Sequence, residues 1–246
     1  MEAGELGLFM ISACAFSVLI FHPASPISQA IPYETLKRVA MGAAMGSTSI
    51  AIVFSPFGKR SGGHFNPAVT LAFLRLGKVK PWDAAFYTLF QFCGGILGVV
   101  LSSITFGSLM SDKAVSYAVT VPGRWGVFPA FVAEVAISFI LMLTVLTISN
   151  TKKLARWTGL FAGALVATYI AVESPISGMS MNPARTFGSA AVGSVWTSLW
   201  IYFTAPPLGM LLAAETRRRL KMGQVACAKL HHYNNKRCIF RCNFER

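Results

Sequence analysis

One short pattern occurs twice in this chain: SGGHFNPAVT at residues 61–70 and SGMSMNPART at residues 177–186. In both copies, Asn-Pro-Ala follows a glycine-containing approach and precedes a short apolar run. Asn is a strong helix N-cap, and Pro is favoured at the first helical position because its missing N–H would be unpaired there anyway. Each copy therefore predicts the start of a helix. The apolar runs that follow are too short to cross a bilayer, so we expect two half-helices.

The remainder of the chain is dominated by long apolar runs. Hydrophobic residues make up 54% of the 246 residues, and charged residues only 13%, against roughly 25% in a typical soluble domain. A membrane-crossing helix needs about 20 mostly apolar residues, and suitable runs occur near residues 6–21, 39–54, 82–106, 127–149, 157–172 and 195–214. The predicted fold class is an all-α integral membrane protein with six transmembrane helices plus two half-helices.

The spacing of the two motifs predicts how the half-helices enter the membrane. Three predicted spans separate the motifs, and because three is an odd number, the half-helices enter from opposite faces. Such interrupted segments are typical of an inverted repeat with its site near the midplane. We expect one channel domain over residues 1–214, built of two inverted halves at about 1–110 and 125–214, followed by a basic, Cys/His-rich cytoplasmic tail at 215–246.

The distribution of positive charge predicts the orientation. The chain has 22 Lys and Arg against 9 Asp and Glu, a net charge of +13. The basic residues collect at the edges of the apolar runs, which argues against a nucleic-acid partner. Most follow the second, fourth and sixth runs, so the positive-inside rule places both termini in the cytoplasm. We expect a multi-pass protein of the plasma (inner) membrane.

The paired motifs carry a resemblance to a known family. Because of Asn66-Pro67-Ala68 and Asn182-Pro183-Ala184-Arg185, the chain resembles the aquaporin (major intrinsic protein) family over about residues 1–214. The resemblance implies six tilted helices around one pore, half-helices that meet at mid-membrane, and a homotetramer with one pore in each subunit. It implies the lipid bilayer, water and small neutral solutes as partners, and no required cofactor.

Physical reasoning about the motifs leads to the same function. A helix N-terminus behaves like about half a positive charge, so two such ends facing each other oppose the passage of cations and protons. The Asn66 and Asn182 amides can donate hydrogen bonds to a passing oxygen. No residue needs to react, so we expect a passive channel and not an enzyme. The alternative is a secondary transporter, which can also contain inverted repeats with broken helices.

The resemblance also implies a narrow outer filter, formed by Arg185, Met179, Ile170 and Gly46. A one-residue insertion near residues 55–58 would replace Gly46 by Met45. Water channels of the family place His at the position of Ile170 and an aromatic residue in the second span. Without these groups the filter should be wider and less polar, which favours glycerol, urea, hydrogen peroxide or neutral metalloid acids as well as water.

Other positions favour a water channel. Thr186 and Ala190 resemble the small residues of water channels, and Tyr202-Phe203 resembles their aromatic pair in the sixth span. The permeant solute therefore stays open at the level of the sequence.

Several ionisable residues lie inside apolar runs. Glu134 lies in the fourth span, and Glu2 or Glu5 has the corresponding place in the first. We interpret them as structural acids that accept hydrogen bonds from the loops carrying the half-helices. The alternative, a proton relay, needs a chain of titratable groups. We expect His64 to line the cytoplasmic vestibule or brace its loop.

The tail contains a candidate metal site. Cys227, His231, Cys238 and Cys242 provide a Cys₃His set that a zinc-like ion could use, although their spacing is not that of a standard zinc finger. The alternative is a basic tail with reduced thiols that contacts anionic lipid. A metal or redox gate acting through this tail is a further hypothesis.

Overall fold

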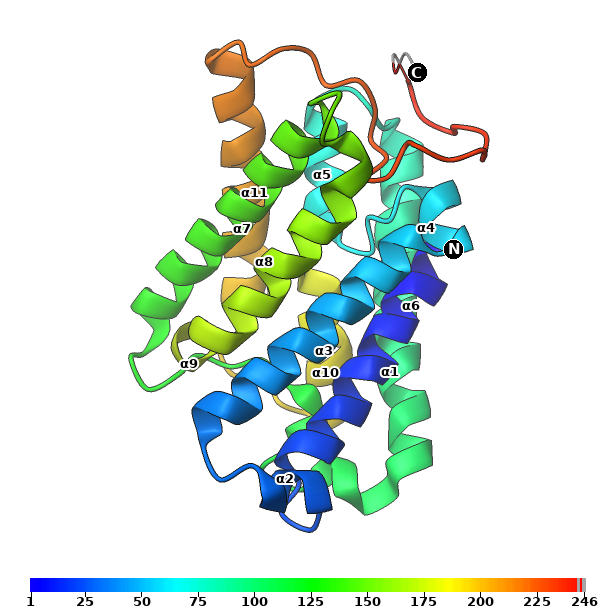
Figure 1. Cartoon of the computed structure of the whole chain (residues 1–246). Coiled ribbons are helices and arrows are strands. Elements are labelled where there is room, and N and C mark those ends of the chain that lie inside the picture. Colours follow the sequence, from blue (N-terminus) through cyan, green and yellow to red (C-terminus); the bar gives the residue numbers. More distant parts are fainter. Residues whose placement is uncertain (243, 245–246) are drawn as a thin grey trace.

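The computed structural model describes residues 1–242 and 244, and this part of the chain is helical with connecting loops (Figure 1). The predicted fold class is confirmed. The six long helices of the described residues correspond to the six predicted spans: α1 (Glu2–Phe21), α3 (Glu34–Phe54), α6 (Pro81–Phe106), α7 (Val127–Ser149), α8 (Thr158–Val172) and α11 (Leu199–Arg219). The two predicted half-helices are α5 (Pro67–Arg75) and α10 (Pro183–Gly193).

Short helices shape the loops between the long ones. They are α2 (Pro26–Ala30), α4 (Pro56–Ser61), η1 (Gly107–Ser111), η2 (Ser116–Ala118), η3 (Ala155–Trp157) and α9 (Ser174–Ser177). Of these, α4 precedes the first half-helix and α9 precedes the second. Both end in a glycine with left-handed backbone, Gly62 at φ 107° and Gly178 at φ 80°, a conformation that glycine adopts without steric cost. These glycines turn the chain back toward the interior.

Three of the long helices extend well beyond the apolar runs that predict them. The α1 helix begins at Glu2, ahead of the run at 6–21, α3 begins at Glu34, ahead of the run at 39–54, and α11 continues to Arg219. By length and mean hydropathy, α1, α6 with η1, α7 and α8 with η3 qualify as membrane spans among the described residues. Charged residues at the ends of α3 and α11 lower their hydropathy. Because these ends can lie in water or the headgroup region, the backbone stays helical there.

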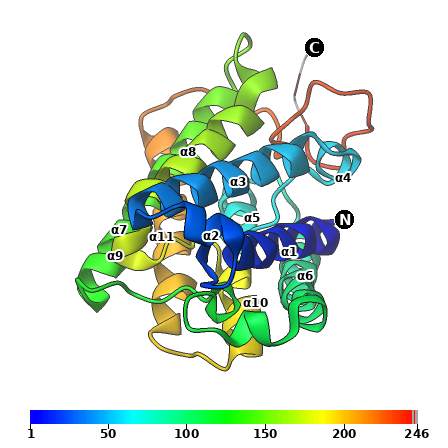
Figure 2. The same cartoon turned by 60° about the horizontal axis from the view of Figure 1, so that its bottom comes forward.

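The two halves of the chain interlock. The first half of the chain consists of α1, α3 and α6 with the half-helix α5, and the second half consists of α7, α8 and α11 with the half-helix α10 (Figures 1 and 2). However, α5 packs on α11 and α10 packs on α6, while α3 pairs with α8. Each half-helix therefore contacts the last long helix of the other half. Both half-helix loops are brought to the centre of the bundle by this exchange.

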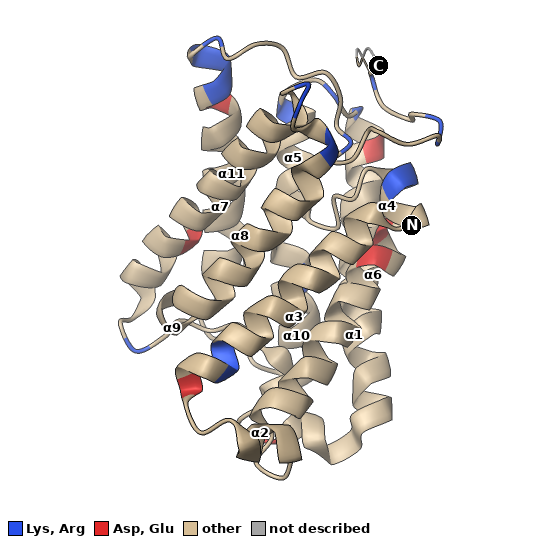
Figure 3. Ribbon diagram, in the orientation of Figure 1, with Lys and Arg blue, Asp and Glu red and all other residues tan. Residues whose placement is uncertain are grey.

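The ends of the bundle differ in charge (Figure 3). The end that holds both chain termini carries most of the Lys and Arg residues, including the last turn of α11 and the tail. The opposite end, where α2 and α9 lie, carries few. This polarity is the pattern expected for a protein oriented by the positive-inside rule.

Candidate pore and the two loops that build it

The half-helix loops meet through their asparagines. The Asn66 side-chain amide (Nδ2) donates to the Met181 carbonyl at 2.7 Å, and the Asn182 amide donates to the Phe65 carbonyl at 2.7 Å. Each asparagine also caps its own half-helix, since Asn66 Oδ1 accepts from the Ala68 N–H at 2.9 Å and Asn182 Oδ1 accepts similarly. An amide nitrogen has two hydrogens. One N–H of each asparagine is therefore left to meet a solute in the cavity.

The residues just before these asparagines have unusual backbone. Phe65 and Met181 are not glycines, yet their φ angles are 32° and 54°. Left-handed backbone at such residues costs about 1–3 kcal/mol each, so it persists only where the surroundings hold it. Their carbonyls accept from the opposite asparagine and their N–H groups donate to buried carboxylates. The loops are thus fixed in a shape that the sequence pattern did not reveal.

Glu134 of α7 holds the second loop. Its carboxylate accepts from the Ser180 N–H at 2.7 Å, the Met181 N–H at 2.8 Å and the Ser177 hydroxyl at 2.8 Å. The side chain is fully buried. These are the contacts of a structural acid that satisfies irregular backbone.

Glu2 of α1 has the same relation to the first loop. Its carboxylate accepts from the Phe65 N–H at 2.8 Å, the His64 N–H at 3.4 Å and the Gln91 amide at 2.5 Å. Glu5, one turn further along, accepts from the Ser61 hydroxyl at 2.5 Å. Of the two acids that the sequence offered in the first span, Glu2 is therefore the geometric counterpart of Glu134.

Besides the buried glutamate, a tyrosine hydroxyl holds each loop, and the two groups together are called the brace of that loop. The Tyr87 hydroxyl of α6 donates to the Ser61 carbonyl at 2.6 Å, and the Tyr202 hydroxyl of α11 donates to the Ser177 carbonyl at 2.5 Å. Sequence reasoning missed Tyr87 and treated Tyr202 only as one of an aromatic pair. The equivalence of the two residues becomes visible only once the halves are superposed in space.

A single cavity of about 280 Å³ runs past both motifs. Its polar lining includes Asn66, Asn182 and Arg185, and its wall also contains Ile170 and Met179. Much of the remaining wall is apolar, including Phe9, Ala13, Val53, Val69, Leu141, Val145 and Val166. A mainly apolar space with a few hydrogen-bonding groups suits a small neutral molecule that must not bind tightly.

Gly46, which the family resemblance implied for the filter, lies outside the cavity lining, and the alternative residue Met45 lies in it. It lies where α3 crosses α8, and a Cβ atom there would be 2.6 Å from the Gly163 carbonyl oxygen and 2.8 Å from the Ala167 methyl group. The difference follows from packing: only glycine permits this close helix crossing, and the neighbouring methionine faces the path.

Arg185 reaches from the second half-helix toward the loop between α6 and α7. Its guanidinium donates to the Thr120 hydroxyl. The backbone N–H of Arg185 is at 3.2 Å from the Asn182 side-chain oxygen. The side chain thus stands at the cavity beside the cap, where a cation at membrane depth marks a functional position.

Comparison with known proteins identifies the family. The model of the family described as "Major intrinsic protein" matches residues 5–216. The chain belongs to the major intrinsic protein family. Among its relatives, glycerol uptake facilitator protein-like 6 of Lactiplantibacillus plantarum is 36% identical over 189 residues, with 73% of this chain and 84% of the relative covered.

Plant relatives and a solved structure extend this result. Aquaporin NIP1-2 of Arabidopsis thaliana is 33% identical over 173 residues, with 69% of this chain aligned and 58% of the relative's length spanned. The X-ray structure of the aquaglyceroporin from Plasmodium falciparum superposes with a TM-score of 0.70, covering 89% of this chain and 94% of that one at 16% identity. At that identity the similarity shows the fold alone.

The tail after the family region closes over the first loop. His64 lies next to the first motif, and its Nε2 atom is 2.9 Å from the Ala228 carbonyl while its Nδ1 atom is 3.0 Å from the Thr70 hydroxyl. The ring of Phe240 is stacked on the His64 ring at 5.6 Å. His64 therefore braces its loop, and two parts of the tail cover it.

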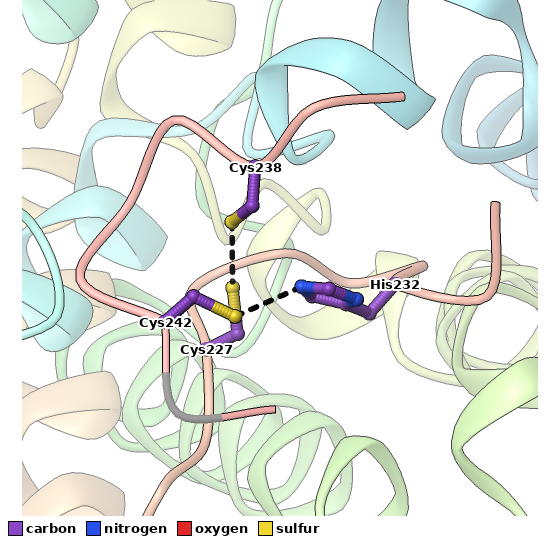
Figure 4. A group of neighbouring side chains, drawn as sticks. All are labelled: Cys227, His232, Cys238 and Cys242. Carbon is purple, nitrogen blue, oxygen red and sulfur yellow. Dashed lines mark hydrogen bonds between the residues drawn. The ribbon is translucent and has the colours of Figure 1, made fainter. Parts of the chain in front are cut away.

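The tail also gathers four possible metal ligands, hereafter the tail cluster: Cys227, His232, Cys238 and Cys242 (Figure 4). Their ligand atoms lie within 4.8 Å of one another. The prediction that His231 belongs to this set is wrong. Its ring packs edge-on against Phe54 at 4.6 Å, and His232, the next residue along, points to the thiols instead. Burial raises the pKa of the Cys227 thiol, and the neighbouring Cys238 thiol raises it further.

Proposed function

We propose that this protein is a passive membrane channel that conducts small uncharged solutes of the glycerol class together with water. The observation that supports the proposal most strongly is the pairing of Asn66 and Asn182 at one cavity, each at the N-terminus of a half-helix from the opposite half of the chain. Membership of the major intrinsic protein family supports a channel for water and small neutral solutes.

The arrangement selects by charge. Two helix N-termini direct their partial positive charges at the middle of the cavity, and Arg185 adds a full charge nearby. A cation must give up its hydration and approach these charges, and both requirements oppose entry. A neutral hydroxyl oxygen can accept from the asparagine amides and move on.

The side chains at the outer end favour a solute larger than water. Ile170, Met179 and Met45 present apolar surface to the cavity beside Arg185. This combination suits a polyol, whose carbon chain contacts the apolar side while its hydroxyls meet the cation. The name of the bacterial relative, a glycerol uptake facilitator-like protein, supports the same class. Thr186 and Ala190 favour water, so we propose that both pass.

We further propose the orientation and assembly. The basic end of the bundle would face the cytoplasm together with both termini, by the positive-inside rule. The chain would reside in the plasma (inner) membrane as a homotetramer, as the family resemblance implies. Exposed apolar side chains on the outer faces of the helices, among them Phe86, Phe90 and Leu97 of α6, would contact lipid or a neighbouring subunit.

We also propose a metal centre at the tail cluster. The channel itself would need no cofactor, and the proposed ligand set of three cysteines and one histidine matches structural zinc sites in composition. The zinc-like ion is therefore proposed as a component of the tail and not of the pore.

The test is a solute panel measured by stopped-flow light scattering on proteoliposomes. Glycerol, urea and water fluxes should exceed those of empty vesicles, should rise linearly with solute gradient and should have a low activation enthalpy. A secondary transporter would instead saturate and show a large activation enthalpy. Failure of glycerol and urea to pass while water does would restrict the proposal to a water channel.

A further inference from the structure

The tail is built into the cytoplasmic end of the cavity and does not hang free. Leu230 lines the cavity, and its N–H donates to the Gly62 carbonyl at 3.0 Å. Ala228 and Lys229 are buried, with exposed fractions of 0% and 2%. Leu230 of the tail therefore forms part of the cavity wall at this end.

The contacts with the first loop alternate along the tail with the residues of the tail cluster. Ala228, which meets His64, directly follows Cys227, and Phe240, which stacks on His64, lies midway between Cys238 and Cys242. Two separate segments of the tail, residues 227–232 and 238–242, therefore reach the same loop; they are called the two limbs below. In each limb the residues that contact the loop lie between two cluster residues: Ala228 and Leu230 between Cys227 and His232, and Phe240 between Cys238 and Cys242.

The cluster has the dimensions of a metal site. Cys227 and Cys238 have their sulfur atoms 3.5 Å apart, and the Cys242 sulfur is 3.0 Å from His232 Nε2 (Figure 4). A Zn–S bond of about 2.3 Å in tetrahedral geometry places two sulfurs about 3.8 Å apart, so small shifts would admit the ion. The sulfur separation is also well above the ~2.05 Å of a disulfide.

We propose that the tail cluster binds one thiophilic divalent cation of the Zn²⁺ class, and that the bound ion fastens both limbs of the tail over the cytoplasmic mouth and reduces solute flux. The gating part of this inference rests on the proposed channel function; the metal site does not. Among the described residues, the tail meets this loop through Ala228, Leu230 and Phe240. Elsewhere it is attached by the Ala226 N–H, which donates to Asn150, and by the His231 ring on Phe54. With the ion bound, the two limbs are cross-linked around His64, so Leu230 is kept in the path.

Metal binding is tested first, on the purified full chain stripped with a chelator and kept reduced. After incubation with Zn²⁺ and gel filtration, elemental analysis should find one zinc per chain. Cys238→Ser should lose it, whereas Cys93→Ser, a substitution of the exposed cysteine on α6, should retain it. The adjacent histidines form a second matched pair: His232→Gln should weaken binding by about 10-fold or more, and His231→Gln should not. Equal zinc content in Cys238→Ser and the parent would overturn the site.

Gating is tested on the same proteins in vesicles, with pyrithione present so that zinc reaches both faces. Zinc should lower glycerol flux about fivefold or more in the parent and in Cys93→Ser, the lower end of typical coupling between sites, and a chelator should restore it. Cys238→Ser should conduct equally with and without zinc. Phe240→Ala, which keeps the ligands, should bind zinc but lose most of the inhibition.

The outcomes separate the two proposals. Zinc bound at one per chain without any change in flux would overturn gating. Inhibition that persists in Cys238→Ser would also overturn it. If the zinc-free parent conducts no solute, the channel proposal fails, and the zinc content still decides the metal site.

Discussion

The two half-helix loops share one scaffold and differ in what is attached to it. Each loop is held by a buried glutamate, a tyrosine hydroxyl and the asparagine of the other loop. At the position after Asn-Pro-Ala, however, the first loop has Val69 and the second has Arg185. The first loop is covered by the tail through His64, and the second opens toward Thr120. The same loop structure therefore carries a cation in one copy and a contact with the tail in the other.

The largest effect should come from the shared brace. Glu134→Ala and Glu2→Ala each leave buried donors of the loop backbone unpaired, at about 1–3 kcal/mol for each group. We expect both variants to lose most of their detergent-stable protein, and to similar extents. Thermal unfolding followed by size-exclusion chromatography measures this. Glu215→Ala, which breaks only ion pairs at the end of α11, is the control. A large loss in just one of the two variants would break the equivalence of the loops.

The next effect concerns the residue in which the loops differ. Arg185→Val makes the second motif end like the first, and it removes a cation from the cavity. We expect glycerol and larger polyols to pass faster, and the exclusion of cations to weaken by about tenfold, which corresponds to about 1.4 kcal/mol of barrier. Solute and ion fluxes in the same vesicles measure the change. Thr120→Val keeps the charge and should have a smaller effect. If Arg185→Val has the same selectivity as the parent, the assignment of Arg185 to the filter is wrong.

A smaller and symmetric effect is expected from the tyrosines. Tyr87→Phe and Tyr202→Phe each remove one hydrogen bond to a serine carbonyl. The cost should be about 1 kcal/mol in each case, with flux nearly unchanged. Matched thermal denaturation of the two variants provides the measurement. If one variant melts like the parent and the other does not, the braces are unequal.

A pH-dependent effect is expected in the loop between α8 and α9, whose glutamate has no counterpart in the first half of the chain. Burial raises the pKa of the Glu173 carboxyl, between α8 and α9, to about 7. Because the folded pKa lies above the unfolded value, folding stability falls as pH rises from about 4.5 to about 7 and is level above that. Glu173→Gln should therefore melt higher than the parent at pH 8 and at the same temperature near pH 4.5. A difference that does not change with pH would contradict the assignment.

Much of the fold could be predicted from the sequence because its signals are local. Apolar runs of sufficient length give the spans, and the Asn-Pro pair fixes the start of each half-helix. The odd number of spans between the motifs gives the inversion. The extended ends of α1, α3 and α11 were missed, since charged residues interrupt hydropathy without interrupting the helix.

The site could be predicted only in part, because its remaining features depend on contacts between distant segments. Nothing local marks Tyr87 as the counterpart of Tyr202. Gly46 and Met45 are neighbours, and which of them faces the cavity depends on the crossing of α3 with α8. In the same way, His231 and His232 are adjacent, so their distances along the sequence from the cysteines differ by only one residue. The fold of the tail decides which of them faces the thiols.

The most direct test of the central claim records glycerol equilibration and the decay of a pH gradient in one preparation of proteoliposomes. Two helix N-termini that direct partial positive charge at an amide-lined centre should admit glycerol rapidly and leave the proton gradient as stable as in empty vesicles. Glycerol equilibration no faster than in empty vesicles, or a pH gradient that collapses along with it, would contradict the account.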